Sequence, residues 1–268
     1  NKKIKESGFF TCPSLDTYPP IAWHNEKYLE KTKARIYKNS DFHIVTPSKW
    51  LADKVGQSIL KIKPLSIIYN GIDIAIFRPY PREETRRELG LPLDKKIILI
   101  VAKGGQANPW KGGNFAQDVI KEFTGDPQTL FVDLGGDTTQ NSLQLKTVSY
   151  VADRTTLAKY YSAADILLYP SIADNCPLVV LEAMACGLPV VSFATGGIPE
   201  IIDHKKTGYV AKYENGDDLI RGLEYILTLN LSETEKMKHN AVKKINDGFT
   251  LKIMTGNYVN LYKKLLGV

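Results

Sequence analysis

The chain has 268 residues, of which 43% are hydrophobic and 24% are charged. This composition is typical of globular proteins and excludes disordered, collagen-like and disulfide-stapled chains. The longest strongly apolar run, residues 97–102, is much shorter than the roughly 20 residues of a membrane-spanning helix. The net charge of +6 comes from the first 64 residues, where 12 Lys and Arg face 6 Asp and Glu, because the remainder holds 23 of each.

Cysteine usage indicates the compartment. The three cysteines, Cys12, Cys176 and Cys186, are odd in number and show no metal-ligand spacing. Such usage favours a reducing environment over a disulfide framework. We therefore predict a cytoplasmic protein.

The first predicted elements amount to less than a domain. Residues 42–46 and 65–69 are expected to be strands that flank a helix over residues 49–59, which is too little for a parallel sheet of its own. The chain begins without Met in a lysine-rich stretch. We expect residues 1–70 to be the remnant of an N-terminal Rossmann-like domain and residues 71–94 to be a linker.

A basic helix is expected within residues 24–38, because four cations recur there at helical spacing: Lys27, Lys31, Arg35 and Lys38. One interpretation is an ordinary solvated helix face. The other is a surface that meets an anionic membrane or an anionic substrate.

Strands and helices alternate from residue 95 onward. Strands are expected at residues 96–102, 130–134, 147–151, 166–169 and 189–193, and helices at 114–123, 157–163, 178–185 and 217–229. This alternation is typical of a parallel sheet with right-handed crossovers. We predict an α/β, doubly wound Rossmann-like domain over residues 95–249, followed by a C-terminal segment, 250–268, with a helix at 251–266.

Several catalytic classes are excluded by their missing motifs. The chain contains no G-x-S-x-G, H-E-x-x-H, paired C-x-x-C or G-x-x-x-x-G-K-[ST]. Its four histidines are scattered, and no D-x-D occurs to hold a divalent metal. We predict no metal site, so protein groups would have to balance the charge of any bound diphosphate.

Three loops follow predicted strands and are expected to share the carboxyl edge of the sheet, where open α/β sheets bind ligands. The first, residues 103–113, is glycine-rich, and its Lys111 precedes a helix N-terminus that attracts negative charge. The third, residues 194–200, contains Gly196 and Gly197 and would by itself be an ordinary βα turn. Because the three loops are expected at one edge of the sheet, we predict that they form a single ligand-binding crevice.

The second loop, residues 170–177, leads into a helix with an acidic residue. Pro177 has no N–H, so Leu178 and Val179 would offer their free N–H groups to an anion. Glu182 stands in an otherwise apolar helix, where burial without a partner would be unfavourable. We expect it to meet a hydroxylated ligand or a partner cation; the alternative is that it faces solvent.

Taken together, these motifs resemble glycosyltransferase family 4. The resemblance is carried by the stretch from Ser171 to Val191, by Gly196–Ile202 and Thr207–Val210, and upstream by Val45–Ala52 and Ile68–Asp73 with Phe77-Arg78-Pro79. Residues 12–19 are similar to a branch associated with capsular and other surface polysaccharides. The resemblance implies the GT-B fold and transfer of a sugar from a UDP- or GDP-sugar donor to an acceptor hydroxyl, with retention and without an essential metal.

The resemblance also implies roles for individual residues. Glu182 would accept hydrogen bonds from the nucleotide ribose, and Lys111 would stabilise the leaving diphosphate. Leu178 and Val179 would offer backbone N–H groups to the donor, with Gly196 and Gly197 nearby. Val151 and Leu157 would border the nucleobase.

Two positions depart from the family pattern. Asp174, eight residues before Glu182, replaces the first glutamate of E-x7-E, and in the closest branch Ala173 would occupy the glutamate position. The catalytic role expected of Asp174 near the transferring sugar is therefore weakened or lost. The arginine that often partners the loop lysine is also missing, and Lys103 is the nearest cation.

These observations lead to one leading prediction: a hexosyltransferase of capsule, exopolysaccharide or O-antigen biosynthesis. Its acceptor would be a saccharide or lipid-linked saccharide, with peripheral contact to the inner membrane face through residues 24–38 and no nucleic-acid partner. The resemblance also implies that the C-terminal helix packs back on the N-terminal domain. The natural protein would therefore be longer, or the chain would self-associate through an exposed stripe on this helix, formed by Ile253, Tyr258, Leu261, Tyr262 and Leu265.

Two alternatives to this prediction are open. A truncated or degenerate module that binds a sugar nucleotide without turnover is favoured by Ala173 and Asp174. A nicotinamide-dependent dehydrogenase is disfavoured because no convincing G-x-G-x-x-G follows the first strand.

Overall fold

The computed structural model describes residues 25–101, 109–136 and 142–268, which form two compact units. The first unit comprises Val45 and the described residues before it, together with Ala52–Ser66; the second comprises Thr46–Leu51 and Ile67–Val268. No helix among the described residues is both long and apolar enough to cross a membrane.

The first unit is small and has little buried surface. It contains helix α2 (Glu26–Asn39), on which no residue is buried, and parts of strand β1 (Ile44–Thr46), helix α3 (Lys49–Gly56) and strand β2 (Leu65–Ile67). The two strands form a two-stranded sheet. The predicted strand-helix-strand order is present, although the helix is three residues shorter than expected.

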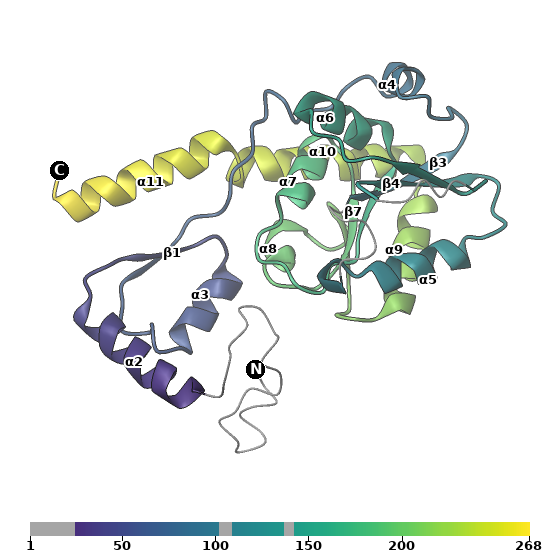
Figure 1. The fold of residues 1–268 in the computed structure, drawn as a ribbon. Helices are drawn as coiled ribbons and strands as arrows, with labels where there is room; N and C mark the ends of the chain where they lie inside the picture. Colours follow the sequence, from purple (N-terminus) through teal and green to yellow (C-terminus); the bar gives the residue numbers. More distant parts are fainter. Residues whose placement is uncertain (1–24, 102–108, 137–141) are drawn as a thin grey trace. The chain divides into compact units, whose positions relative to one another are not determined.

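The second unit is built around a six-stranded sheet (Figure 1). Its strands are β3 (Lys96–Val101), β4 (Thr129–Leu134), β5 (Leu145–Val148), β6 (Ile166–Tyr169), β7 (Val190–Phe193) and β8 (Gly208–Ala211). All pair in parallel, in the order β5-β4-β3-β6-β7-β8. Counted from β3, this is the doubly wound order 3-2-1-4-5-6, whose ligand crevice is expected where the order reverses, between β3 and β6.

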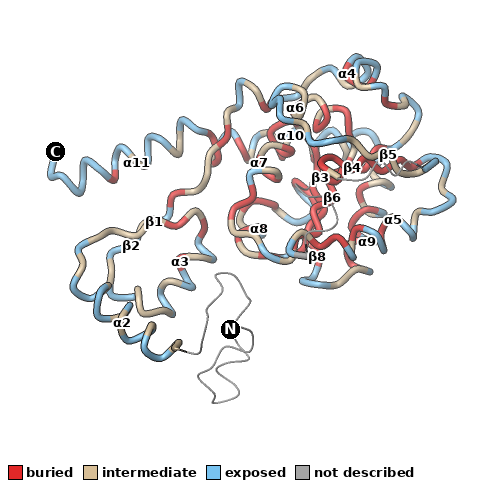
Figure 2. The backbone as a smooth tube through the Cα atoms, viewed as in Figure 1, coloured by how far each residue is buried: buried red, intermediate tan, exposed pale blue. Residues whose placement is uncertain are grey.

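Helices cover both faces of the sheet, and all of its strands except the half-buried β5 are largely buried between them (Figure 2). Helices α5 (Gly113–Glu122) and α9 (Gly216–Leu227) share one apolar cluster with Ile98 and Ile100. Helices α6 (Arg154–Ala163), α7 (Leu178–Ala185) and α10 (Leu231–Gly248) share the other with Ile97 and Leu99. Successive strand residues point to opposite faces, so a run that is buried on both faces is continuously apolar. The predicted doubly wound domain is confirmed.

Four shorter or peripheral helices complete the described structure: α4 (Arg82–Glu88), the 3-10 helix η2 (Pro109–Lys111), α8 (Ile198–Ile201) and α11 (Leu251–Leu266). Helix α4 lies in the segment expected to be a linker. Strand β5 ends at Val148, three residues before the predicted end, so Val151 lies in the loop that leads to α6.

Helix α11 has the predicted bounds but not the predicted exposure. Tyr262 and Leu265 are 56% and 53% exposed, as expected, whereas Leu261 is buried at 8%. Tyr258 is half-buried, and its ring centroid lies 6.0 Å from that of Tyr262. The expected apolar stripe is therefore interrupted, and its exposed part is confined to the last turns.

Candidate functional site

The three predicted loops are hydrogen-bonded to one another at the carboxyl edge of the sheet. The Ser171 hydroxyl and the Ile172 N–H both donate to the carbonyl of Trp110, at 3.0 and 3.1 Å. Thr195 donates its hydroxyl to the Ser171 carbonyl at 3.0 Å. Gly197 N–H donates to the Asn175 carbonyl at 2.8 Å. The prediction that these loops converge is confirmed.

Glycines allow the close approach of the loops. A Cβ on Gly112, which has φ of 68°, would lie 1.9 Å from the Pro170 carbonyl oxygen. A Cβ on Gly196, which has φ of 53°, would lie 1.8 Å from that of Asp174. Both positions need backbone that other residues rarely adopt. Gly196 and Gly197 therefore join the third loop to the second and do not line the pocket described next.

A pocket of about 370 Å³ opens where the strand order reverses. Six of the predicted site residues line it: Lys111, Val151, Leu157, Leu178, Val179 and Glu182. Sequence reasoning missed Phe77, Val101, Leu134, Gly135, Tyr150, Ala152, Arg154 and Tyr169, which also line it. Tyr169 could have been found, because it is the last residue of a strand at this edge. Lys103 lies outside the described residues.

Lys111 is held at the pocket by two acceptors. Its ammonium lies 2.9 Å from the Asp174 carboxylate and donates to the Tyr169 hydroxyl at 3.1 Å. The Tyr169 hydroxyl in turn donates to the same oxygen of Asp174 at 2.5 Å. Burial, and then the charge of Asp174, raise the pKa of Tyr169, so it remains a neutral donor. Asp174 thus neutralises the cation that was predicted to bind phosphate.

Glu182 is hydrogen-bonded to a tyrosine of the chain, whereas the sequence led us to expect a hydroxylated ligand or a partner cation. The Tyr161 hydroxyl donates to its carboxylate at 3.2 Å. Burial raises the pKa of Glu182 to about 7, against the opposing effects of this hydrogen bond and of Arg154. The carboxylate lines the pocket, where it can accept hydrogen bonds from a hydroxylated ligand.

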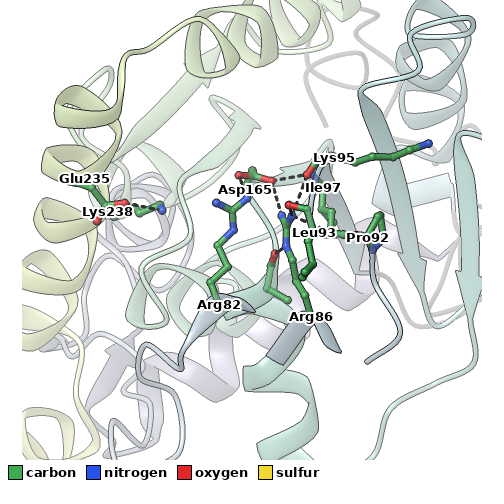
Figure 3. Close-up of polar contacts among 10 residues, drawn as sticks. Arg82, Arg86, Pro92, Leu93, Lys95, Ile97, Asp165, Glu235 and Lys238 are labelled. Atoms are coloured by element: carbon green, nitrogen blue, oxygen red, sulfur yellow. Dashed lines mark hydrogen bonds and ion pairs between the residues drawn. The ribbon is translucent and has the colours of Figure 1, made fainter. Parts of the chain in front are cut away.

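A second charged cluster lies at the opposite, amino edge of the sheet (Figure 3). Arg86, only 1% exposed, donates to the Asp165 carboxylate at 2.8 Å and to the carbonyls of Ala163, Pro92, Leu93 and Lys95. Asp165 also accepts from Arg82 at 2.5 Å and from the Ile97 N–H at 2.8 Å. Protein acceptors satisfy every side-chain nitrogen of Arg86, whereas the buried Nε of Arg82 has no hydrogen-bond partner among the described residues. We regard the pairing of Arg86 with Asp165 as structural.

A pocket of about 480 Å³ lies beside this cluster, between α6 and α10. Two of its cations are already paired, Arg82 with Asp165 and Lys238 with Glu235 at 2.8 Å. Among the described residues, no group of three or more His, Cys, Asp and Glu could hold a metal ion. The carboxyl-edge pocket is therefore the candidate site.

Comparison with known proteins identifies the family of this chain. The family model described as "Glycosyl transferases group 1" matches residues 81–244. This span is more than half of the chain and includes the loops that form the pocket. The chain belongs to this glycosyltransferase family.

Curated relatives carry a more specific name. D-inositol 3-phosphate glycosyltransferase of Mycobacterium marinum is 24% identical over 268 residues, which cover 93% of this chain and 54% of that protein. The protein of the same name from Mycobacterium leprae is 29% identical over 231 residues, which cover 79% of this chain and 50% of that protein. The chain spans about half the length of these relatives.

Solved structures show the same fold. Sucrose-phosphate synthase from Thermosynechococcus elongatus matches with a TM-score of 0.77 at 23% identity, covering 90% of this chain and 62% of that chain. Anabaena HepE in complex with UDP and glucose matches with a TM-score of 0.72 at 18% identity, covering 88% and 67%. The predicted α/β fold of the GT-B type is confirmed.

Proposed function

We propose that the carboxyl-edge pocket binds a nucleoside-diphosphate sugar, and that this chain is the donor-binding part of a glycosyltransferase. The observation that carries the proposal is the gathering of Lys111, Leu178, Val179 and Glu182 around one pocket at the switch point of the sheet. A cation, a helix N-terminus and a partly buried carboxylate match the diphosphate and ribose of such a donor. Glycosyltransferase group 1 membership supports this assignment.

Each group has a chemical task in this proposal. The Glu182 carboxylate accepts hydrogen bonds from the ribose hydroxyls, and Val151 and Leu157 border the base. Lys111, together with the first N–H groups of α7, stabilises negative charge as the diphosphate leaves. We expect no essential metal. A UDP-sugar is the first donor to test, because a protein of similar fold was solved with UDP and glucose.

The reaction we propose is retaining transfer of a hexose to an acceptor hydroxyl, in capsule, exopolysaccharide or O-antigen biosynthesis. Asp174 would lie close to the transferring sugar, since its partner Lys111 lines the pocket. The names of the curated relatives differ from this acceptor class, so an acceptor screen must include inositol phosphate as well as saccharide and lipid-linked saccharide acceptors.

We also propose a cytoplasmic location, with peripheral contact to the inner membrane face. Lys27, Lys31, Arg35 and Lys38 are all exposed on α2. Each Lys or Arg near an anionic lipid surface contributes on the order of 1 kcal/mol to the free energy of membrane binding. Neutralising Lys27, Lys31 and Arg35 together should weaken sedimentation with phosphatidylserine vesicles; undiminished binding would exclude this contact.

One observation favours a second candidate, a sugar-nucleotide-binding module without turnover. Asp174 already neutralises Lys111 and is one methylene shorter than the family's glutamate, while Ala173 supplies no carboxylate. Such a module would bind the donor without transferring or hydrolysing it.

The deciding experiment is a titration of the chain with UDP, GDP, ADP and NAD, without metal and then with magnesium, followed by thermal unfolding. Ligand at 100 times its dissociation constant stabilises the folded state by about 2.7 kcal/mol. A metal-independent shift with one nucleoside diphosphate is expected. No shift with any of them would contradict the proposed site, and binding without sugar transfer in the full-length protein would favour the second candidate.

A further inference from the structure

Helix α3 begins at a carboxylate from a distant part of the sequence. Its first two N–H groups, from Lys49 and Trp50, each donate to the Glu200 carboxylate at 2.8 Å. The next one, from Leu51, donates to the hydroxyl of Ser48 at 3.1 Å. These residues all belong to the second unit. Three N–H groups that a helix leaves unsatisfied are thus capped, two of them by Glu200.

Ser48 links this cap to the second loop of the candidate site. Its side chain, 1% exposed, makes a short hydrogen bond to the Asn175 side-chain oxygen. Because the same hydroxyl accepts from Leu51, its proton is directed at Asn175. The position of the capped helix start therefore fixes the position of Asn175.

A second segment reaches the same two loops. The Tyr69 hydroxyl donates to Glu200 at 2.8 Å, and the Asn70 amide donates to the Cys176 carbonyl at 3.0 Å. Burial, and then the hydrogen bond to Glu200, raise the pKa of Tyr69 to about 12, so its hydroxyl stays protonated. Glu200 thus accepts three hydrogen bonds, and residues 175 and 176 are each held from outside their own loop.

The turn that is held in this way leads directly into the pocket. Asp174 precedes it and pairs with Lys111, and Pro177 follows it, immediately before Leu178 and Val179 at the start of α7. A displacement of the turn would move both the cation and the N–H groups that we assign to the diphosphate. It would leave the ribose and base contacts of Glu182 and Leu157 less affected, because those residues lie on α7 and α6 farther from the turn.

We propose that Glu200 is a positioning residue for the diphosphate end of the nucleotide site, acting through Ser48 and Asn175. This inference rests on the proposed nucleotide site. Glu200 does not line the pocket, so its effect is indirect. The chemistry predicts a selective defect: loss of Glu200 weakens binding of a nucleoside diphosphate more than binding of the corresponding monophosphate.

The test measures UDP and UMP affinities of the full chain by calorimetry, at a temperature where every variant is folded. GDP and GMP replace them if the wild type prefers guanine. Glu200→Ala should lower the diphosphate affinity by roughly tenfold, the scale of losing hydrogen bonds to a charged group. The monophosphate affinity should fall less than about threefold. Glu200→Gln retains one carbonyl acceptor and should fall between wild type and Glu200→Ala.

Two further variants keep the test decisive if Glu200→Ala does not fold. Ser48→Ala and Asn175→Ala each remove one step of the connection, and both should reduce the diphosphate-to-monophosphate affinity ratio. A double variant that combines either substitution with Glu200→Gln should lose less diphosphate-binding free energy than the two single variants lose together. The reason is that the effects of substitutions within one hydrogen-bond network are not additive. Glu235→Ala is the matched control, an exposed, ion-paired glutamate on α10, and should leave both affinities unchanged.

The outcomes separate this inference from the proposed function. A wild-type chain that binds none of the nucleotides contradicts the proposed function itself. A wild type that binds, with Glu200 variants that keep its affinity ratio, overturns only the positioning role. Equal losses for the two nucleotides would also overturn it, since a general loss of structure predicts that result.

Discussion

Strand β6 has an aspartate on either side of it, and each aspartate pairs with a basic side chain in a different setting. Asp165, immediately before the strand, is shared by Arg86 and Arg82, and Arg86 is 1% exposed. Asp174, five residues after the strand, pairs with Lys111, whose side chain is 31% exposed. One cluster lies at the amino edge of the sheet and the other at the carboxyl edge, where it lines the pocket.

The two clusters differ in how many hydrogen-bond donors of the cation have acceptors within the protein. Every nitrogen of Arg86 donates to a protein acceptor, so the cluster fixes the loop before β3 and the start of β6. The Lys111 ammonium carries three donors and has two acceptors among the described residues, Asp174 and Tyr169. Similar residue types thus stabilise the fold at one edge and leave capacity for an anion at the other.

The largest expected effect is a loss of folding stability when the cluster at the amino edge of the sheet is broken. Arg86→Met would leave Asp165 with reduced compensation and would remove the donor to four carbonyls, of which that of Ala163 is buried. Removing one partner of a buried ion pair typically costs about 3–5 kcal/mol, so the midpoint of urea unfolding should fall sharply. Nucleotide affinity of the folded fraction should not change. Arg82→Met, at a side chain that is 39% exposed, is the control and should cost less than about 1 kcal/mol.

Lys111→Met should show the reverse of Arg86→Met: a large loss of nucleotide affinity and a small loss of stability. Hydrogen bonds to charged groups contribute about 1.5–3 kcal/mol, so nucleoside-diphosphate affinity should fall by roughly 10- to 100-fold in a calorimetric titration. The free energy of unfolding should change by less than about 1 kcal/mol. Lys159→Met is a matched control, because Lys159 is 30% exposed and pairs with Glu88 away from the pocket. A large stability loss in Lys111→Met would remove the contrast between the two edges.

Glu182→Gln should weaken nucleotide binding and yet stabilise the domain. Because burial raises the pKa of Glu182 to about 7 from 4.5, the folded state keeps a proton that the unfolded state releases between these values. Stability therefore falls as pH rises through this window, and the penalty is full above pH 7. The conversion is about 1.4 kcal/mol per pKa unit, reduced because Glu182 is partly exposed. At pH 8, Glu182→Gln should therefore raise the free energy of unfolding by on the order of 2 kcal/mol. Equal unfolding free energies of the two proteins at pH 8 would contradict this.

The smallest effect expected is the pH dependence of binding. If the ionised form of Glu182 accepts from the ribose, nucleotide affinity should rise by about tenfold between pH 6 and pH 8, following ionisation near pH 7. The phosphates titrate in the same range, so the informative quantity is the difference between wild type and Glu182→Gln. A difference that does not change with pH would refute the ribose role of the carboxylate.

Local patterns were sufficient to predict the elements around the pocket. The bounds of β6 and α7 agree with the prediction, because β6 is a continuous apolar run followed by Pro170 and α7 is apolar except for Glu182 and is followed closely by Gly187. Spacing also placed Lys111 and Glu182 at one edge of the sheet. Helix α10 was missed, although Asn230 and Glu233 form a capping box that the sequence displays.

Contacts between distant residues could not be predicted in the same way. The hydrogen bonds of Glu200 to Lys49 and Trp50 span 151 and 150 positions, and that of Asn70 to Cys176 spans 106. Nothing in the local sequence around Glu200 distinguishes a cap for another helix from a solvent-exposed glutamate. The same holds for Asp174, for which the family resemblance implies a place near the transferring sugar, and whose contact with Lys111 no local pattern predicts.

Strand β6 also sets a limit on insertions and deletions. It has four residues, of which Ile166 and Leu168 face one apolar cluster and Leu167 and Tyr169 the other. Gaining or losing one residue would exchange these faces, as any one-residue shift in a strand does. The Tyr169 hydroxyl would then leave Lys111, or Asp165 would leave Arg86. We expect length variants of this protein to be tolerated in surface loops and rejected within this strand, which holds the structural cluster and the pocket at a fixed separation.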